Sequence, residues 1–372
     1  MTIELRRVTA DDWESWRPVR LAALAEAPDA FGSTLADWQD APEHRWRTRL
    51  SIPGALDLVA FAVAVDGAVP VGLASGVPDP DDPERTELIS MWVEPAARGQ
   101  GVARALITAI ARWAASSGAL TLTLSVMPDN DAARRAYERT GFTASDTPGD
   151  ALPDGRHEVV MLRDLTPERT LDAYERAADR YTERTDDHRA GLVDDLVALV
   201  PPGSHVLELG SGPGRDALAL EAAGLVVDRT DGAQSFVDAL REQGHHARLL
   251  DVRSGGFGGP FDAVFANAVL LHVQRTAIGG VLARALAAVR PGGVLAATVK
   301  RGDGEAWTTR KLDRARHFTY WTDDALAEVV AGAGWHDVVV RETTATDADG
   351  RRTAAERWLT VTARRPEEAG RP

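Results

Sequence analysis

Two patterns of hydrophobic and polar residues divide this chain of 372 residues into halves. In the first half, some segments alternate apolar and polar residues, which predicts strands, and others place apolar residues three and four positions apart, which predicts helices. Strands are predicted at 3–8, 86–93, 120–126 and 157–162. Helices are predicted at 10–26, 37–50, 101–117 and 131–139. With a hairpin turn at Asp66-Gly67, this order predicts an α+β fold with a mixed sheet.

The second half begins with two predicted helices and then alternates strands with helices from Val206 onward. Such alternation favours a parallel sheet with helices on both faces, so the whole chain is predicted to be an α/β protein of two domains. Pro167 follows the capping residue Thr166, as at the start of a new helix. We therefore expect a first domain at 1–163, a linker at 164–169, a second domain at 170–364 and a disordered tail at 365–372.

Composition and charge exclude several kinds of site. The chain has no cysteine, which excludes disulfides, thiolate nucleophiles and cysteine-ligated metals, and its nine histidines show no ligand spacing such as HExxH, so no metal site is predicted. The net charge of −14 disfavours a nucleic-acid partner, because nucleic acids are bound mainly through Lys and Arg. No apolar run approaches the ~18 residues of a membrane helix, and the N-terminus lacks a signal-peptide pattern, so we expect a cytoplasmic protein with no membrane partner.

A glycine-rich corner lies between the strand that ends at Met91-Trp92-Val93 and the helix predicted at 101–117. Its residues are Arg98, Gly99, Gln100, Gly101, Val102 and Ala103. Glycines at such a corner let backbone N–H groups approach a diphosphate, and the helix N-terminus adds a partial positive charge. Downstream, the segment from Asn130 to Phe142 reads N-x-x-A-x-x-x-Y-x-x-x-G-F. Together the two motifs resemble those of the GNAT N-acetyltransferases, and the resemblance covers residues 3–163.

This resemblance implies acetyl-CoA as the cofactor and an amine, on a small molecule or a peptide, as the acceptor. It implies cofactor-binding roles for Met91, Val93, Arg98, Gly99, Gln100, Gly101, Val102, Ala103 and Asn130. Tyr137 would protonate the thiolate of CoA, unless it is only a packing aromatic. Because an amine must be neutral to attack, a base is needed; Glu87 is the candidate, with Ser90 as a water relay, and a solvent-facing role for Glu87 is the alternative. We expect four tryptophans in the core rather than in an acceptor pocket: Trp13, Trp16, Trp38 and Trp46.

A second glycine-rich corner follows the strand Val206-Leu207-Glu208-Leu209, with glycines at Gly210, Gly212 and Gly214. A dinucleotide fold needs G-x-G-x-x-G, and here the third position falls on Arg215, so NAD is the lesser alternative. The spacing E-x-G-x-G-x-G resembles that of class I methyltransferases that use S-adenosylmethionine (SAM), over residues 170–364. The resemblance implies a Rossmann-like fold. SAM carries a sulfonium cation, which is compatible with a carboxylate such as Glu208.

Other positions in this half fit the same resemblance. Asp231 ends the next predicted strand, where a carboxylate can accept ribose hydroxyls, with Asp228 as its competitor. The resemblance implies that Asp251 and Val252 contact the adenine. The other cofactor-binding residues it implies are Glu208, Gly210, Ser211, Gly212, Gly214, Asp231 and Asn267. His272 is expected to be structural, and a leading helix is expected at Tyr174–Tyr181. Candidates for the wall of the acceptor pocket are Tyr174, Tyr181, Trp307, Arg310, Tyr320 and Trp321.

The leading hypothesis is a bifunctional transferase that acetylates an amine with acetyl-CoA and methylates a small-molecule acceptor with SAM. In the alternative, only one half is catalytic and the other is a cofactor-sensing or structural module. Modification of RNA or protein is a third, less favoured hypothesis. The sequence leaves open the identity of both acceptors, whether they are one compound, and the oligomeric state.

Overall fold

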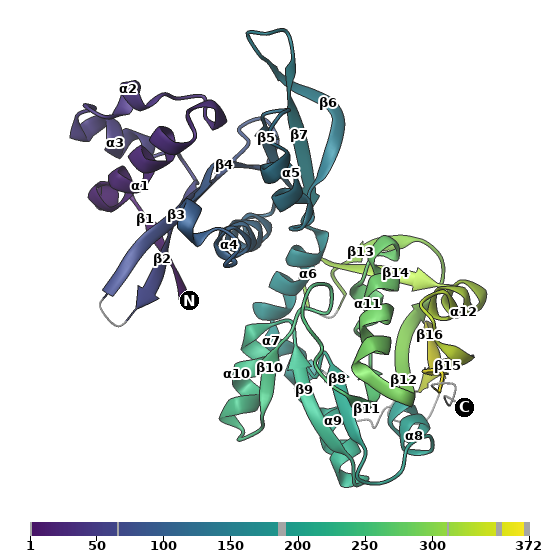
Figure 1. Ribbon diagram of the computed structural model, residues 1–372. Coiled ribbons are helices and arrows are strands. Elements are labelled where there is room, and N and C mark those ends of the chain that lie inside the picture. Colours follow the sequence, from purple (N-terminus) through teal and green to yellow (C-terminus); the bar gives the residue numbers. More distant parts are fainter. Residues whose placement is uncertain (1, 65–66, 185–190, 311, 347–351, 368–372) are drawn as a thin grey trace, which may run out of the picture. The chain divides into compact units, whose positions relative to one another are not determined.

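The computed structural model describes residues 2–64, 67–184, 191–310, 312–346 and 352–367 (Figure 1). It divides into two compact units, Met1–Arg169 and Thr170–Pro372, which we call the N-terminal and the C-terminal unit. The division falls inside helix α6 (Thr166–Glu175), whose first turn occupies part of the segment expected to be a linker. No helix in the described ranges is long and apolar enough to cross a membrane.

The N-terminal unit is built on one mixed sheet of seven strands in the order β1-β2-β3-β4-β5-β7-β6. The strands are β1 (Thr2–Val8), β2 (Leu56–Ala64), β3 (Gly67–Pro78), β4 (Arg85–Val93), β5 (Thr121–Val126), β6 (Thr143–Ala151) and β7 (His157–Asp164). The helices are η1 (Ala10–Asp12), α1 (Trp13–Glu26), η2 (Pro28–Ala30), α2 (Leu35–Trp38), α3 (Glu43–Arg49), η3 (Pro95–Ala97), α4 (Val102–Ser116) and α5 (Asp131–Glu138). Only β4 and β5 run parallel, so the predicted mixed sheet is confirmed.

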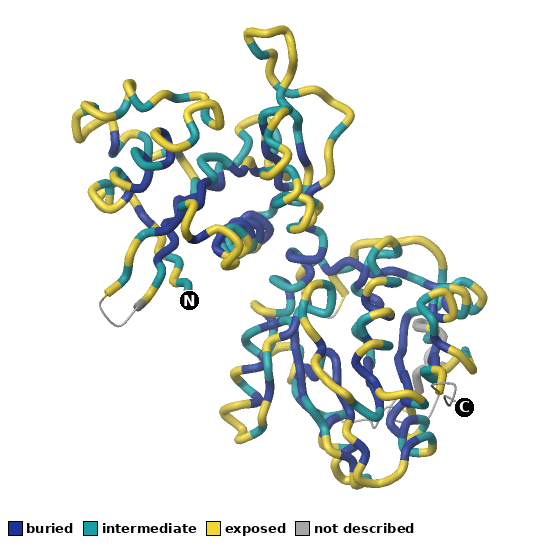
Figure 2. The backbone as a smooth tube through the Cα atoms, viewed as in Figure 1, coloured by how far each residue is buried: buried dark blue, intermediate teal, exposed yellow. Residues whose placement is uncertain are grey.

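Alternation along the strands gives this sheet two apolar faces. On β2, Leu58 and Ala60 pack in a cluster with α4, whereas Val59 and Phe61 pack in a second cluster with α1 and α3, because successive side chains point to opposite faces. Figure 2 shows the sheet buried between these helices. The expectation for the tryptophans is confirmed. Trp16 and Trp46 are fully buried in the second cluster, and Trp13 and Trp38 pack against it.

The prediction of one helix at 37–50 is wrong. The structure has two short helices, α2 and α3, separated by residues 39–42. Pro42 caps α3 in an extended conformation; because proline lacks an N–H group and disfavours helical geometry in the residue before it, a continuous helix cannot pass through this position. Of the predicted hairpin turn, Gly67 begins β3, and Asp66 lies outside the described residues.

Strand β4 departs from regular geometry where the glycine-rich corner begins. Its register against β3 gains one extra residue between Ile89 and Trp92, and Ser90 in this bulge has a φ of 55°. Pairing with β5 is confined to the residues from Arg85 to Glu87. From Leu88 onward β4 and β5 therefore separate, which leaves backbone groups of β4 without a strand partner on that side.

The C-terminal unit is built on a mostly parallel sheet. The strands are β8 (His205–Leu209), β9 (Val226–Asp231), β10 (Ala247–Leu249), β11 (Phe261–Ala266), β12 (Val289–Arg301), β13 (Glu305–Thr308), β14 (Arg316–Trp321), β15 (His336–Thr346) and β16 (Arg352–Arg364). The order β10-β9-β8-β11-β12 is parallel throughout, and β16 lies antiparallel between β12 and β15. Besides α6, the helices are α7 (Ala178–Arg184), α8 (Gly191–Val197), α9 (Arg215–Ala222), α10 (Gln234–Glu242), η4 (Leu270–His272), α11 (Arg275–Ala288) and α12 (Asp323–Gly332).

Helices cover both faces of this sheet, as predicted. On β11, Val264 and Ala266 pack with α11 and α12, whereas Ala263 and Phe265 pack with α8 and α9. Two details of the prediction are wrong. Three helices rather than two precede β8, and the expected helix Tyr174–Tyr181 is interrupted, since α6 ends at Glu175 and α7 begins at Ala178. Arg365, expected in the tail, donates its backbone N–H to the Gly293 carbonyl at 2.8 Å.

Candidate functional sites

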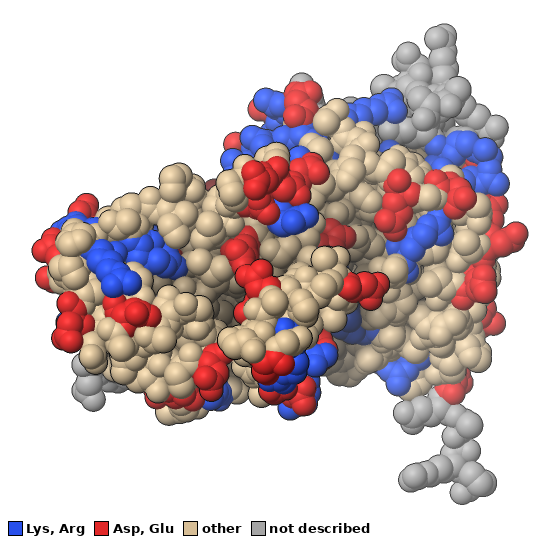
Figure 3. Space-filling view, turned by 90° about the horizontal axis from the view of Figure 1, so that it is seen from above, with Lys and Arg blue, Asp and Glu red and all other residues tan. Residues whose placement is uncertain are grey.

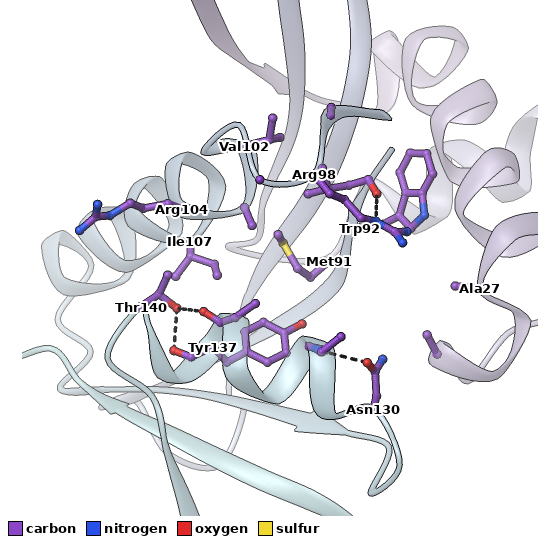
Figure 4. Close-up of a pocket in the computed structure, with 18 of the residues that line it drawn as sticks. Ala27, Met91, Trp92, Arg98, Val102, Arg104, Ile107, Asn130, Tyr137 and Thr140 are labelled. Atoms are coloured by element: carbon purple, nitrogen blue, oxygen red, sulfur yellow. Dashed lines mark hydrogen bonds between the residues drawn. The ribbon is translucent and has the colours of Figure 1, made fainter. Parts of the chain in front are cut away.

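The separation of β4 from β5 lies beside a pocket of about 770 Å³ (Figure 4). The pocket is bounded by the end of β4, the loop before α4, α5, and the segment from α1 to η2. Of the residues predicted to bind the first cofactor, all but Gln100 line it: Met91, Val93, Arg98, Gly99, Gly101, Val102, Ala103 and Asn130. Gln100 is exposed and donates to the Ala96 carbonyl. The pocket thus joins segments that are far apart in sequence.

The loop before α4 offers backbone rather than side-chain groups to this pocket. Gly99 and Gly101 have φ angles of 78° and 89°, a conformation that favours glycine, and Gly101 begins α4 without a side-chain cap. The side chain of Arg98 is bound to the wall, since it donates to the Val93 carbonyl at 3.0 Å and to the Glu26 carboxylate at 2.7 Å. Glu26 also accepts from Trp92 Nε1, and nothing in its sequence context indicated this role.

Tyr137 extends from α5 into the pocket (Figure 4). Its ring packs edge-on against Phe142 at 5.7 Å. Burial raises the pKa of Tyr137 to about 12, so the phenol keeps its proton at neutral pH. Asn130, the first residue of the motif, caps α5 by accepting from the Ala133 backbone N–H at 3.1 Å. It therefore fixes the start of the helix that carries Tyr137.

Glu87 lies on β4 four residues before Met91 and does not line this pocket. The side chain of Glu87 is exposed, as in the solvent-facing alternative, although partial desolvation and the carboxylates of Asp79, Glu158 and Asp150 raise its pKa above the ordinary value. A raised pKa brings the carboxylate closer to the range in which a general base works at neutral pH. The structure therefore puts Tyr137 in the pocket and Glu87 outside it, in an acidic environment on the same strand as Met91.

A buried polar cluster that the sequence analysis missed lies at the bulge. Arg49 donates to Asp57 at 3.1 Å, to Ser75 at 2.8 Å and to Ser90 at 3.2 Å. Ser75 also donates to Asp57, and both are buried. These contacts hold the side chain of Ser90, the residue suggested as a water relay, one position before Met91.

The second glycine-rich corner lies at the carboxyl end of β8. Gly210, Gly212 and Gly214 all have positive φ angles, of 68°, 49° and 85°. A Cβ atom on Gly210 would lie 2.3 Å from a methyl group of Val269, and one on Gly214 would lie 2.7 Å from Leu240. Conformation and close packing both require glycine at these two positions.

Two buried carboxylates hold this corner. Glu208 accepts a hydrogen bond from Ser211, and burial raises its pKa to about 8. Asp231 accepts from the backbone N–H groups of Gly212 at 2.9 Å and Ala233 at 2.8 Å, and burial raises its pKa to about 6. Its competitor Asp228 instead pairs with Arg248 at 3.3 Å. Asp231 is therefore the aspartate that contacts the glycine corner.

The remaining residues predicted for this site have protein partners. Asp251 forms an ion pair with Arg253 at 2.6 Å, and Val252 packs against the core next to it. At the end of β11, Asn267 donates to Asp216 at 2.8 Å and accepts from Thr298 at 2.7 Å. These bonds fix Asn267 at the carboxyl edge of the sheet, near the turn that carries Val269.

His272, expected to be structural, belongs to a partly buried hydrogen-bond chain. Its Nδ1 lies 2.9 Å from the His317 carbonyl, and its Nε2 lies 2.8 Å from the Tyr174 hydroxyl. Since a carbonyl only accepts, Nδ1 carries the proton and Nε2 accepts from Tyr174. Burial lowers the pKa of His272 to about 3, so the ring stays neutral. Arg316 donates to the Tyr174 oxygen at 3.0 Å and completes the chain.

Two other aromatic candidates for an acceptor wall, Tyr181 and Trp321, differ in their surroundings. Tyr181 packs edge-on against Tyr174 at 5.5 Å and faces Gly212. Trp321, in contrast, is buried in the core under the guanidinium of Arg275. Across the described ranges, no three His, Asp or Glu side chains are grouped so that they could hold a metal ion.

Comparison with known proteins identifies the two halves. Residues 13–142 match the Acetyltransferase (GNAT) family, and residues 181–340 match a methyltransferase domain. The chain is 34% identical over 117 residues to the L-2,4-diaminobutyric acid acetyltransferase of Streptomyces coelicolor, covering 28% of this chain and 68% of that protein. It is 33% identical over 145 residues to the mycothiol acetyltransferase of Rhodococcus erythropolis, covering 38% of this chain and 46% of that protein. The chain thus spans less than half the length of that mycothiol acetyltransferase.

Two solved structures resemble parts of the chain. One is the 1,6-didemethyltoxoflavin-N1-methyltransferase of Burkholderia thailandensis with bound S-adenosylhomocysteine, with 22% identity, coverage of 54% of this chain and 87% of that chain, and a TM-score of 0.41. The other is a GCN5-related N-acetyltransferase from Kribbella flavida, with 24% identity, coverage of 44% and 97%, and a TM-score of 0.36. By its sequence matches, the chain belongs to the GNAT acetyltransferase family and carries a methyltransferase domain in the same polypeptide.

Proposed function

We propose that the chain is a bifunctional transferase, which acetylates an amine with acetyl-CoA at its N-terminal domain and methylates a second group with SAM at its C-terminal domain. The observation that carries the first activity is the joining of Gly101, the unpaired end of β4 and Tyr137 in one pocket. For the second, it is the glycine corner held by Glu208 and Asp231 at the carboxyl edge of a parallel sheet, where ligands of such sheets bind.

The residues of the first pocket fit acetyl-CoA. The backbone of Met91 and Val93, beyond the last pairing with β5, would hold the pantetheine arm, and the amides from Gly99 to Ala103 would hold the pyrophosphate. Acetyl-CoA supplies an acyl group on a thiol leaving group. Tyr137 would give its proton to the sulfur that leaves when the amine nitrogen bonds to the acetyl carbon and the carbon–sulfur bond breaks.

The amine must lose a proton in the same reaction. We assign this to Glu87, acting through water held at Ser90, because its pKa is raised towards the range of a general base. The carboxylates near Glu87 would also attract an amine that arrives as an ammonium ion.

Several observations favour a small molecule as the acetyl acceptor. The names of both relatives, which denote acetyltransferases for mycothiol and for L-2,4-diaminobutyric acid, refer to small molecules. The chain carries a net charge of −14, and acidic and basic side chains are interspersed on the face drawn in Figure 3. Both features weaken the alternative of a nucleic-acid acceptor.

The residues of the second site fit SAM. Asp231 would accept the ribose hydroxyls, Asp251 and Val252 would meet the adenine, and Glu208 would lie near the positive charge of the ligand. SAM supplies a methyl group on a sulfonium leaving group. The residues of this site then have to hold the acceptor in line with that methyl group and exclude water. Tyr181 beside Gly212, with Tyr174 packed against it, is suited to do so.

Calorimetry with each donor, followed by transfer assays with labelled acetyl-CoA and labelled SAM over a panel of amines, tests the proposal. Asp231→Asn should weaken SAM binding, whereas Asp228→Asn, which alters an ion pair away from the corner, should not. Binding of one donor without transfer to any acceptor would assign a sensing role to that half. Failure of both donors to bind would refute the proposal.

A further inference from the structure

Helix α1 places two unsatisfied hydrogen-bond donors one turn apart on its buried face. Arg20 is 8% exposed, and its Nη1 has no hydrogen-bond partner in the described part of the chain. Trp16, four residues earlier, is fully buried, and its Nε1 also lacks a partner there. Both atoms can only donate. Buried donors are normally satisfied, so their occurrence as a pair requires an explanation.

The charge of Arg20 is also uncompensated. None of the ion pairs found in the described ranges includes Arg20, and Asp57, the buried carboxylate of the neighbouring cluster, is bound by Arg49 and Ser75. Burial and the nearby charge of Arg49 lower the pKa of Arg20 to about 10. Arg20 is therefore a second buried guanidinium beside Arg49, and the one carboxylate of the cluster is bound by Arg49. An arginine in this setting is costly to the fold unless an anion joins it.

Contacts of Arg20 and Arg49 connect them to the pocket proposed for acetyl transfer and to the end of β4. The guanidinium carbon of Arg20 lies 4.4 Å from the ring centre of Phe31, which lines the pocket. The guanidinium carbon of Arg49 lies 5.5 Å from the ring centre of Trp16, and Arg49 donates to Ser90 in the bulge before Met91. The unsatisfied donors thus lie between the pocket wall and the bulged end of β4.

We propose that Arg20, Trp16 Nε1 and Arg49 form a subsite for a carboxylate of the acetyl acceptor. The acceptor is then an amine that also bears a carboxylate, of the size of an amino acid, and not a simple polyamine. A carboxylate is an acceptor-only group that a guanidinium binds through two parallel N–H bonds, so it would satisfy donors that no protein group satisfies. The inference rests on the proposed acetyltransferase activity and extends it to the substrate class.

Pairs of amines that differ only by a carboxylate test this specificity. L-2,4-diaminobutyrate is compared with 1,3-diaminopropane, L-ornithine with putrescine, and L-lysine with cadaverine, in acetyl transfer by the full chain. We expect kcat/KM to be ~10- to 100-fold higher for the acid of at least one pair, the range for losing a hydrogen bond to a charged group. Arg20→Gln should remove this preference by lowering only the rate with the acid. Equal rates within every pair, or equal losses in Arg20→Gln, would overturn the inference.

Arg17→Gln is the matched control. Arg17 lies on the same helix, and its guanidinium donates to the Gln39 carbonyl at 2.9 Å, away from the cluster. It should keep the preference for the acid. Trp16→Phe removes Nε1–H together with part of the indole ring, and should reduce the preference in part.

A stability measurement decides the inference even if none of these amines is acetylated, which would count against the proposed function instead. Sodium acetate, compared with sodium chloride at equal ionic strength, should raise the melting temperature of the wild-type chain, because a ligand that binds the folded state stabilises it. The same comparison should give no shift in Arg20→Met. An identical acetate response in the two proteins would overturn the subsite.

Discussion

Replacing Glu208 with glutamine should remove a pH dependence from SAM binding. Glu208 is 2% exposed and accepts a hydrogen bond from Ser211, and burial raises its pKa to about 8 from the ordinary 4.5. A pKa one unit above the solution pH leaves only ~10% of a carboxyl group ionised. At pH 7 and without SAM, Glu208 is therefore mostly neutral.

Binding of SAM should favour the ionised carboxylate, because the ligand carries a sulfonium and an ammonium group. Ionising Glu208 at pH 7 costs ~1.4 kcal/mol, the energy of one pKa unit, so SAM should bind ~10-fold more weakly at pH 7 than at pH 9. The affinity should rise with pH up to about 8 and then level off. In Glu208→Gln this contribution is absent.

The stability of the protein without SAM should change in the opposite direction. Because the folded-state pKa of Glu208 is raised above 4.5, the stabilising protonated form is fully present below pH 4.5 and is lost as the pH rises through about 8. Asp231, with a pKa raised to about 6, acts in the same sense at lower pH. Between pH 6.5 and 8, Glu208→Gln should therefore flatten the loss of stability.

Calorimetric titration with SAM from pH 6.5 to 9, in two buffers of different ionisation enthalpy, counts the protons released. The α-amino group of SAM titrates near pH ~8 as well, but it does so with either protein, so the difference between wild type and Glu208→Gln isolates Glu208. Asp228→Asn should behave as wild type, because Asp228 pairs with Arg248 away from the corner. Equal proton release by wild type and Glu208→Gln would refute the reasoning.

Three further experiments test the two sites. Tyr137→Phe should lower kcat for acetyl transfer by ~100- to 10,000-fold while CoA binding by calorimetry stays intact, and unchanged kcat would exclude the acid role. Gly101→Ala and Gly118→Ala, at the two ends of α4, both force alanine into a left-handed conformation. Each should lower the free energy of unfolding, measured in urea, by ~1–2 kcal/mol, but only Gly101→Ala should weaken CoA binding. Gly210→Ala should lower the free energy of unfolding by ~1–3 kcal/mol more than this backbone strain, because the new methyl group overlaps Val269. Adding Val269→Ala should restore most of that extra loss, and strictly additive effects of the two substitutions would contradict this.

The parts of the sites that the sequence predicted are those fixed by local backbone geometry. Gly101, Gly210 and Gly214 adopt left-handed conformations at strand-to-helix corners, and such a demand appears in the sequence as glycine at a fixed spacing. Asp231 was preferred to Asp228 by its place at the end of a strand, and it is the aspartate that contacts the corner. The kind of sheet in each half was predicted from the spacing of hydrophobic residues, which also reflects local backbone geometry.

The contacts that the sequence did not reveal join residues far apart in the chain. Arg49 reaches Ser90 over 41 positions, Arg98 reaches Glu26 over 72, and Arg316 reaches Tyr174 over 142. No spacing rule links such partners, because folding alone brings them together. A single arginine in a sequence rich in arginine gives no sign that it will be buried.

The place of β16 in its sheet bears on how the chain is made. This strand follows both β12 and β15 in the chain and lies between them, where residues Trp358 to Arg364 pair with Lys300 to Val294. Until it emerges from the ribosome, the nascent methyltransferase domain exposes the unpaired edge of β12, the kind of edge that recruits other chains. The N-terminal unit, complete at Arg169, can fold long before that point. A ribosome that stalls late would thus release a folded acetyltransferase domain joined to an aggregation-prone partner.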